Sequence, residues 1–196
     1  MKKVITIIAI ILMVAVVGIV GMRIISSRHV MDGPGMVNEP AAEPIDGGHY
    51  DNSDPNASKE VKSEELTEFY FDGAPAEFDD EALPALRYKF SAKLEGGKLS
   101  GEYTALYSDD PDLKKDFTSD KAFMEKLNEI IKSYDLPSFN GLYEMTAGIP
   151  NDYGAELEAA YASGETINAY SNDTCFISVE AFKEIERLFA EYAGIE

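Results

Sequence analysis

Histidine, cysteine and tryptophan are almost missing from this sequence of 196 residues, which has two histidines, one cysteine and no tryptophan. With Cys175 alone, no intramolecular disulfide can form, so a domain in an oxidising compartment must rely on its hydrophobic core. His29 and His49 both fall in a polar stretch ahead of the predicted domain, so we expect no imidazole beside a nucleophile there. The sequence therefore predicts neither a nucleophilic triad nor a zinc site, and it predicts Cys175 as a half-buried structural residue.

Complete motifs for phosphate and calcium are also missing. The stretch 52–63 imitates the start of a calcium loop, but Ala57 stands where glycine is required and Ser63 stands where a bidentate glutamate belongs. The glycine pairs lack the spacing and the following helix of a phosphate loop. We expect no cofactor and no metal ion, with weak cation binding by the acidic loops as the alternative.

Basic residues are scarce after Arg28. Residues 29–196 hold 13 Lys and Arg against 36 Asp and Glu, a net charge of −23. Such a domain repels nucleic acid, so we expect no nucleic-acid partner. Solubility is the first role of this acidity, and a cationic partner is the alternative.

One long apolar run is present, at the start of the sequence. Val4–Met22 is nineteen residues without a charge, and as a helix it would measure about 28 Å, close to the hydrocarbon thickness of a bilayer. A cleaved signal peptide is the alternative, but its apolar region has only about 7 to 15 residues and ends in an A-x-A-like site. We therefore expect residues 4–22 to cross the membrane uncleaved.

Flanking charges set the expected orientation. Lys2 and Lys3 precede the run and Arg23 and Arg28 follow it, which with the terminal amine favours a cytoplasmic N-terminus. The C-terminal domain would then lie outside the cytoplasm, attached to the cell membrane by a single pass.

Three segments follow from this composition. Residues 1–28 form a membrane anchor with basic flanks, 29–63 a disordered acidic linker rich in Gly, Pro and Asp, and 64–196 an extracytoplasmic α+β domain.

Alternation of apolar and polar residues predicts the strands. Leu86–Leu94 is the clearest, and if Gly96 and Gly97 form a two-residue turn, paired positions sum to 193, so that Phe90 faces Tyr103. A second hairpin pairs Ala159 with Ile167 if its loop has three residues, with a two-residue loop as the alternative. The remaining strand candidates are Leu66–Phe71, Leu142–Ala147, Leu157–Tyr161 and Ile167–Tyr170.

Two amphipathic helices are predicted, one from a cap at Ser119 or Asp120 to Tyr134, the other from Ser178 to Gly194. Asp109–Asp116 is interpreted as an acidic loop. The predicted fold is α+β, an antiparallel sheet of about five or six strands with both helices on one face, preceded by the transmembrane helix and a disordered stalk.

The loop region 136–154 is the predicted binding site, because it is long for a connection and rich in aromatic, amide and carboxylate groups. Such groups suit a sugar or a peptide, whereas the alternative interpretation packs the rings beneath the loop. The candidate residues are Phe139, Asn140, Tyr143, Asn151, Asp152 and Tyr153. A basic row on the polar sheet face, Arg87, Lys89 and Lys93, is expected to be neutralised by Glu102.

Two classes of function stay open. The first is a non-catalytic binding or sensing domain of the bacterial cell envelope, with an envelope protein or glycan as ligand. The alternative is a carboxylate-based hydrolase at the cell surface, in which Glu156 and Glu158 would stand about 7 Å apart on one strand face. The layout resembles that of small, singly anchored extracytoplasmic proteins of bacteria, in architecture alone.

Overall fold

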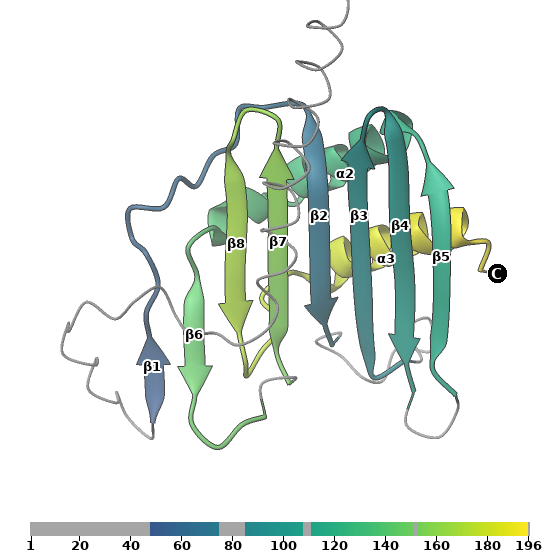
Figure 1. Ribbon diagram of the computed structural model, residues 1–196. Coiled ribbons are helices and arrows are strands. Elements are labelled where there is room, and N and C mark those ends of the chain that lie inside the picture. The colour runs from purple at the N-terminus through teal and green to yellow at the C-terminus, as the bar shows by residue number, and fades with distance from the viewer. Residues whose placement is uncertain (1–47, 75–84, 108–110, 151–152, 196) are drawn as a thin grey trace, which may run out of the picture. The chain divides into compact units, whose positions relative to one another are not determined.

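The computed structural model describes residues 48–74, 85–107, 111–150 and 153–195. One sheet runs through them, with two α-helices and a short 3₁₀ helix (Figure 1). The strands are β1 (His49–Asp51), β2 (Leu66–Gly73), β3 (Arg87–Glu95), β4 (Lys98–Leu106), β5 (Leu113–Ser119), β6 (Tyr143–Thr146), β7 (Ala155–Tyr161) and β8 (Thr166–Ser171). The helices are α2 (Lys121–Ser133), η2 (Leu136–Phe139) and α3 (Val179–Ala193).

The predicted antiparallel sheet of five or six strands is wrong. The sheet has eight strands in the order β1-β6-β8-β7-β2-β3-β4-β5. It is mixed, because β6 runs parallel to β8, with Tyr143 beside Tyr170 and Glu144 beside Ser171. β8 lies between β6 and β7 in the sheet, although it follows both of them in the chain. The chain therefore passes from β6 to β7 across the position that β8 occupies.

The two strands missed by sequence reasoning lie at the edges of the sheet. β5 falls partly inside the stretch interpreted as an acidic loop, since Lys114, Lys115 and Asp116 interrupt its alternation. An edge strand has one neighbour only and tolerates such charges. β1 is three residues long, too short for any periodic signal.

Both hairpin registers are confirmed. Phe90 faces Tyr103 and Glu95 faces Lys98, as a two-residue turn at Gly96 and Gly97 requires. In the second hairpin Ala159 faces Ile167, which is the register of the three-residue loop.

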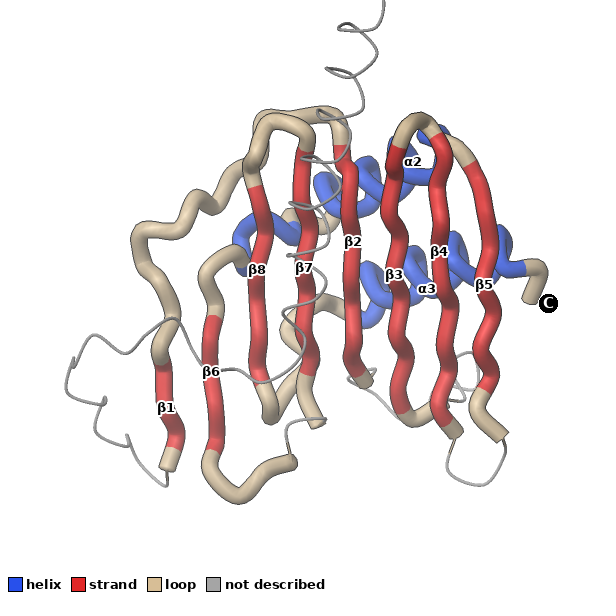
Figure 2. The backbone as a smooth tube through the Cα atoms, in the orientation of Figure 1, coloured by secondary structure: helices blue, strands red, loops and turns tan. Residues whose placement is uncertain are grey.

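Both α-helices pack on the same face of the sheet (Figure 2). α3 places Phe182 5.5 Å from Phe71 and Phe189 5.0 Å from Phe90, measured between ring centroids. α2 places Phe123 5.0 Å from Phe189. Asp120 caps α2 by accepting the Ala122 N–H, and Ser178 caps α3 by accepting the Ala181 N–H, so the cap signals of the sequence hold.

Residues 48–63, which the composition assigned to the linker, are hydrogen-bonded to the domain, first to β6 and the loop before it and then, at Lys62 and Ser63, to Glu165. The Asn52 N–H donates to the Tyr143 carbonyl, and the Tyr143 N–H donates to Ser53 Oγ, at 2.9 and 3.0 Å. The Asp54 N–H donates to the Gly141 carbonyl at 2.8 Å. Backbone pairing with a neighbouring strand therefore orders a segment whose own side chains bury little surface.

The predicted transmembrane run, residues 4–22, lies outside the described residues, as does linker segment 29–47. Among the residues that are described, the longest helices are too short and too polar to span a bilayer.

Candidate functional site on the helix-free face

The six predicted site residues have different surroundings. Asn140 is buried, where its side chain donates to the Ser58 carbonyl and accepts the Asn168 N–H, at 2.9 and 2.8 Å. Phe139 packs against the ring of Phe176, 5.3 Å between centroids. These two residues therefore stabilise the loop from inside, as the alternative interpretation held.

Asn151 and Asp152 lie outside the described residues. Tyr153 is 62% exposed and is one of the large apolar side chains that reach solvent. It directly precedes Gly154, whose carbonyl accepts a hydrogen bond from Arg87. Tyr153 therefore adjoins the residue that binds Arg87, and its ring is exposed enough to contact a ligand.

Tyr143 belongs to a row of side chains that crosses the helix-free face, the sheet face opposite α2 and α3. Tyr143 lies beside Tyr170, Tyr170 faces Glu156, and Glu156 faces Asp72. The Tyr143 and Tyr170 ring centroids are 5.3 Å apart and the ring planes are tilted by 34°. Burial raises the pKa of Tyr170, and the neighbouring Tyr143 and Glu156 raise it further, which places these three groups in one electrostatic cluster.

Tyr170 is a candidate site residue that sequence reasoning missed. Its alternation with Ile167 and Ala169 already placed it on the polar face, where a large aromatic residue is informative. What the sequence could not supply was its neighbour, because Tyr143 reaches it through the parallel β6–β8 pair.

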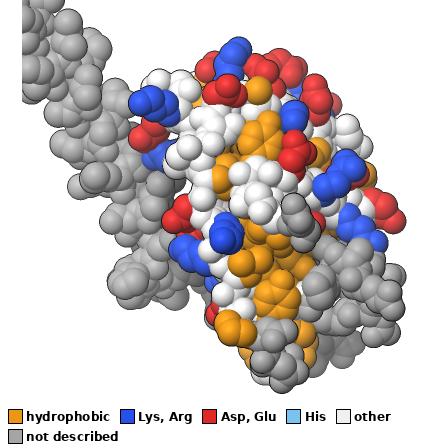
Figure 3. Space-filling model, turned by 90° about the vertical axis from the view of Figure 1, so that its right-hand side faces the viewer, with side chains coloured by type: hydrophobic (Ala, Val, Ile, Leu, Met, Phe, Trp, Pro, Cys, Tyr) orange, Lys and Arg blue, Asp and Glu red, His pale blue; other side chains and the backbone are white. Residues whose placement is uncertain are grey.

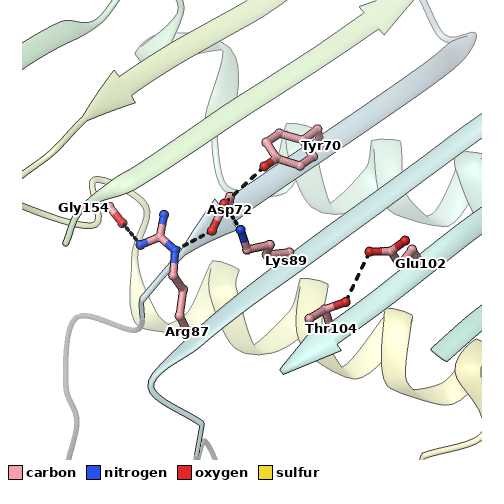
Figure 4. A network of polar contacts seen from close by, with 7 residues as sticks. All are labelled: Tyr70, Asp72, Arg87, Lys89, Glu102, Thr104 and Gly154. Atoms are coloured by element: carbon pink, nitrogen blue, oxygen red, sulfur yellow. Dashed lines mark hydrogen bonds and ion pairs between the residues drawn. The ribbon is translucent and has the colours of Figure 1, made fainter. Parts of the chain in front are cut away.

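Asp72 continues the row as the centre of a polar network (Figure 4). It is 7% exposed. Its Oδ1 accepts Arg87 Nε at 2.5 Å, and its Oδ2 lies 3.0 Å from Lys89 Nζ and 3.2 Å from the Tyr70 hydroxyl. Arg87 also donates to the Gly154 carbonyl at 3.1 Å. The network therefore joins β2, β3 and the segment that opens β7.

The predicted neutralisation of the basic row by Glu102 is wrong. Asp72 pairs with Arg87 and Lys89, and Glu68 pairs with Lys93 at 3.1 Å. Glu102 instead pairs with Lys114 of β5 at 2.7 Å. Asp72 and Glu68 belong to β2, where they lie directly opposite Lys89 and Lys93 of β3. The residues of β4 opposite these two lysines carry no carboxylate.

Glu156 and Glu158 share the helix-free face of β7, facing Asp72 and Tyr70 respectively. Burial raises the pKa of a third carboxyl, Glu186, although its hydrogen bond from Tyr103 opposes the shift. Glu186 lies on the helix side of the sheet, since Tyr103 belongs to the core. A raised-pKa acid and the Glu156–Glu158 pair are therefore on opposite faces and cannot act on one bond.

Cys175 is half-buried, and its thiol lies 3.9 Å from the Ile177 carbonyl. Burial raises the pKa of this thiol to about 11. The group is therefore protonated at neutral pH and is not a nucleophile.

His49 corrects an argument from the sequence, because it lies in β1 and not outside the folded part. Its Nδ1 is 3.1 Å from Thr146 Oγ1, which donates to Asp173 Oδ2 at 2.7 Å. Because the hydroxyl proton points at the carboxylate, the imidazole must be the donor to Thr146. Hydrogen bonds from Thr146 and Ser171 lower the pKa of Asp173.

This arrangement differs from a nucleophilic triad, in which the imidazole lies between hydroxyl and carboxylate. Here the hydroxyl of Thr146 is in the middle: its proton is donated to Asp173 and one of its lone pairs accepts from His49. We interpret the His49–Thr146–Asp173 chain as a clasp that holds β1 and β6 to the end of β8.

A shallow groove of about 730 Å³ lies between α2 and α3. Its cations are paired with its own acids, Arg187 with Glu184 at 2.6 Å and Lys126 with Glu191 at 3.8 Å. The groove contains neither a predicted site residue nor an acid of the sheet.

Within the described ranges, no three His, Cys, Asp or Glu side chains are grouped as metal ligands. Asp54, in the stretch that imitates a calcium loop, accepts the Asn56 N–H at 2.8 Å in a local turn. Comparison of the chain with protein-family models and with curated proteins finds no match.

Proposed function

We propose that this chain is a binding or sensing domain of the bacterial cell envelope, and that it binds its ligand on the helix-free face at Tyr143, Tyr170 and Glu156. One observation carries the proposal: two tyrosine rings stand side by side, 5.3 Å apart, in the same row as a carboxylate. Aromatic rings supply contact area with little loss of side-chain entropy, and the carboxylate and the hydroxyls supply directional hydrogen bonds. This combination suits an envelope glycan or peptide.

Tyr153 extends the proposed site. It is exposed, and it adjoins the Gly154 carbonyl that anchors Arg87. A ligand lying along the start of β7 would reach both the exposed ring and the tyrosine pair. Phe139 and Asn140 support this surface from within and do not contact the ligand.

The proposed location is the outer side of the cell membrane, with residues 4–22 as a single-pass anchor and the N-terminus in the cytoplasm. The nineteen uncharged residues and their basic flanks support this. The anchor would hold the binding face close to other envelope components.

The test is a double substitution of Tyr143 and Tyr153 by alanine in the full chain, inserted in nanodiscs. Soluble glycan fragments and peptides from the envelope serve as ligands in isothermal titration. We expect one of these ligand classes to bind wild type and to lose about tenfold or more in affinity, about 1.4 kcal/mol. Tyr134→Ala, at the C-cap of α2, is the control, a half-buried tyrosine on the helix side, and should keep full affinity.

Melting temperatures of the same variants separate binding from folding. If the double variant melts at a much lower temperature but binds as wild type does, the two rings are structural and the proposal fails. Release of cleaved glycan by wild type, abolished in Glu156→Gln, would instead favour the hydrolase.

A further inference from the structure

β5 ends the sheet, and its outer edge faces no other strand in the described part of the chain. Figure 3 looks onto this side of the molecule and shows hydrophobic side chains gathered between charged ones. Phe117 of β5 packs against Tyr192 of α3, 6.2 Å between ring centroids. The ladder from β4 runs without a register shift over all seven residues of β5, so the edge is regular.

The register of the sheet determines which backbone groups of β5 point outward. Gly96 and Gly97 both have positive φ, so Glu95 and Lys98 flank a two-residue turn and exchange two hydrogen bonds. Hydrogen-bonded and non-hydrogen-bonded pairs then alternate along each ladder. The even-numbered residues of β4 bond to β3 and the odd-numbered ones bond to β5, so Lys114, Asp116 and Thr118 direct their N–H and C=O groups away from the sheet.

An antiparallel partner strand must use these even-numbered residues. If the partner is a second copy of β5, the two-fold symmetric registers that pair most of its seven residues centre on Lys115, Asp116 or Phe117. Centring on Asp116 places the two Asp116 side chains opposite each other, and centring on Phe117 pairs no opposite charges within β5. Centring on Lys115 has one like-charge pair, Lys115 with Lys115. Only the register centred on Lys115 places Lys114 opposite the partner's Asp116, twice by symmetry.

We propose that β5 pairs with β5 of a second copy of this chain, in the register centred on Lys115. On the helix-free face each Lys114, which pairs with Glu102 of its own copy at 2.7 Å, then lies between Glu102 and the partner's Asp116. On the helix side, Leu113 meets the partner's Phe117, which extends the core of each copy across the joint. The two sheets become one continuous sheet with a two-fold axis through the Lys115 pair.

The opposing view is that the lysines protect the edge from pairing. Short length, bulges and proline also protect an edge, whereas β5 is regular and has a lysine and an aspartate at the spacing that self-pairing requires. In the proposed register Lys115 lies opposite the Lys115 of the second copy. Both side chains are exposed, and a long lysine side chain can turn its amine to water.

Cysteine substitution tests the register. Lys114→Cys, Lys115→Cys and Asp116→Cys are each made in the full chain with Cys175→Ser, in detergent, and oxidised with copper phenanthroline. In the proposed register the two Lys115 Cα atoms lie about 4.5 Å apart at a non-hydrogen-bonded pair, within disulfide range. The Lys114 and Asp116 positions lie more than about 7 Å from their own copies, too far for a disulfide.

We therefore expect covalent dimer from Lys115→Cys and little from the other two variants. Dimer mainly from Lys114→Cys or Asp116→Cys would show a different register and overturn the ion-pair argument. Unchanged circular dichroism of the reduced variants, whose sites are exposed, confirms that they fold.

Charge reversal tests the partner without any cross-link. Lys114→Asp and Asp116→Lys should each self-associate at least tenfold more weakly than wild type in analytical ultracentrifugation. Mixed together they should associate again, because each copy then offers the charges that the other requires. A wild type that stays monomeric up to about 1 mM, or a mixture no better than its components, refutes the proposal.

Discussion

Replacing Asp72 by alanine tests whether the polar network that joins β2, β3 and the start of β7 stabilises the fold. The change removes the acceptor of three donors at once, from Arg87, Lys89 and Tyr70. The Arg87 side chain is only 12% exposed, and removing one partner of a buried ion pair costs about 3–5 kcal/mol. Arg87 keeps its bond to the Gly154 carbonyl, so we expect the lower end, about 3 kcal/mol.

The assay is urea unfolding of the full chain, followed by circular dichroism, on wild type and three variants. Lys89→Ala is the matched control, because the Lys89 side chain is 42% exposed and Asp72 keeps Arg87. We expect it to cost less than about 1 kcal/mol, as exposed pairs do. Asp72→Asn, which keeps an acceptor oxygen but loses the charge, should fall between the two.

A double-mutant cycle with Arg87→Ala isolates the pair. We expect a coupling above about 1 kcal/mol, because residues that share a buried network are not additive. The reasoning is refuted if Asp72→Ala costs no more than Lys89→Ala, since the carboxylate would then be solvated and the network would not hold the strands.

Three further predictions address the core, the pH dependence and the topology. Phe90→Ala should cost about 3–5 kcal/mol in the same urea assay, since the ring is fully buried and contacts five other rings; a loss below about 1 kcal/mol contradicts the core assignment. The raised pKa of Glu186 means that the native state holds its proton longer than the unfolded state, so stability falls as pH rises through that window. Glu186→Gln should therefore be more stable than wild type at pH 7 and should lose this advantage below about pH 4, whereas an equal difference at both pH values excludes the shift. Protease added to intact cells should release a fragment that begins between residues 29 and 47, because residues 48–63 are hydrogen-bonded to the domain; digestion only after lysis contradicts the orientation.

The hairpins and helix caps could be predicted because their signals are local. Gly96 and Gly97 fix the turn, the alternation from Leu86 to Leu94 fixes the face, and together they determine the register. Ser178 and Gly194 mark the ends of α3 in the same way. Each of these features depends on residues that are close in sequence.

The edge strands and the parallel pair could not be predicted because their signals are not local. β1 becomes a strand only through hydrogen bonds to β6, and the clasp through Asp173 comes from a segment more than one hundred residues later. The composition of residues 48–63 is that of a linker. It contains no information about the β6 edge that orders it.

The candidate site shows the same difference between local and non-local signals. Loop composition selected Tyr143, Tyr153 and Phe139 alike, and it could not separate the exposed Tyr153 from Phe139, whose ring packs on Phe176. An aromatic residue in a loop serves either role, and only its neighbours decide which.

The tyrosine row follows from the order of the strands. Tyr143, Tyr170 and Glu156 come from β6, β8 and β7, and they become neighbours because β8 enters between two strands that precede it in the chain. Had β6 paired directly with β7, Tyr143 would adjoin a charged strand and would have no aromatic partner. The insertion of β8 therefore creates the ring pair, and the clasp from Asp173 to Thr146 holds β6 at the level where the rings meet. Loosening that clasp with Asp173→Ala should separate the rings before it unfolds the core, because the core residues of β2, β3 and α3 lie on the other side of the sheet.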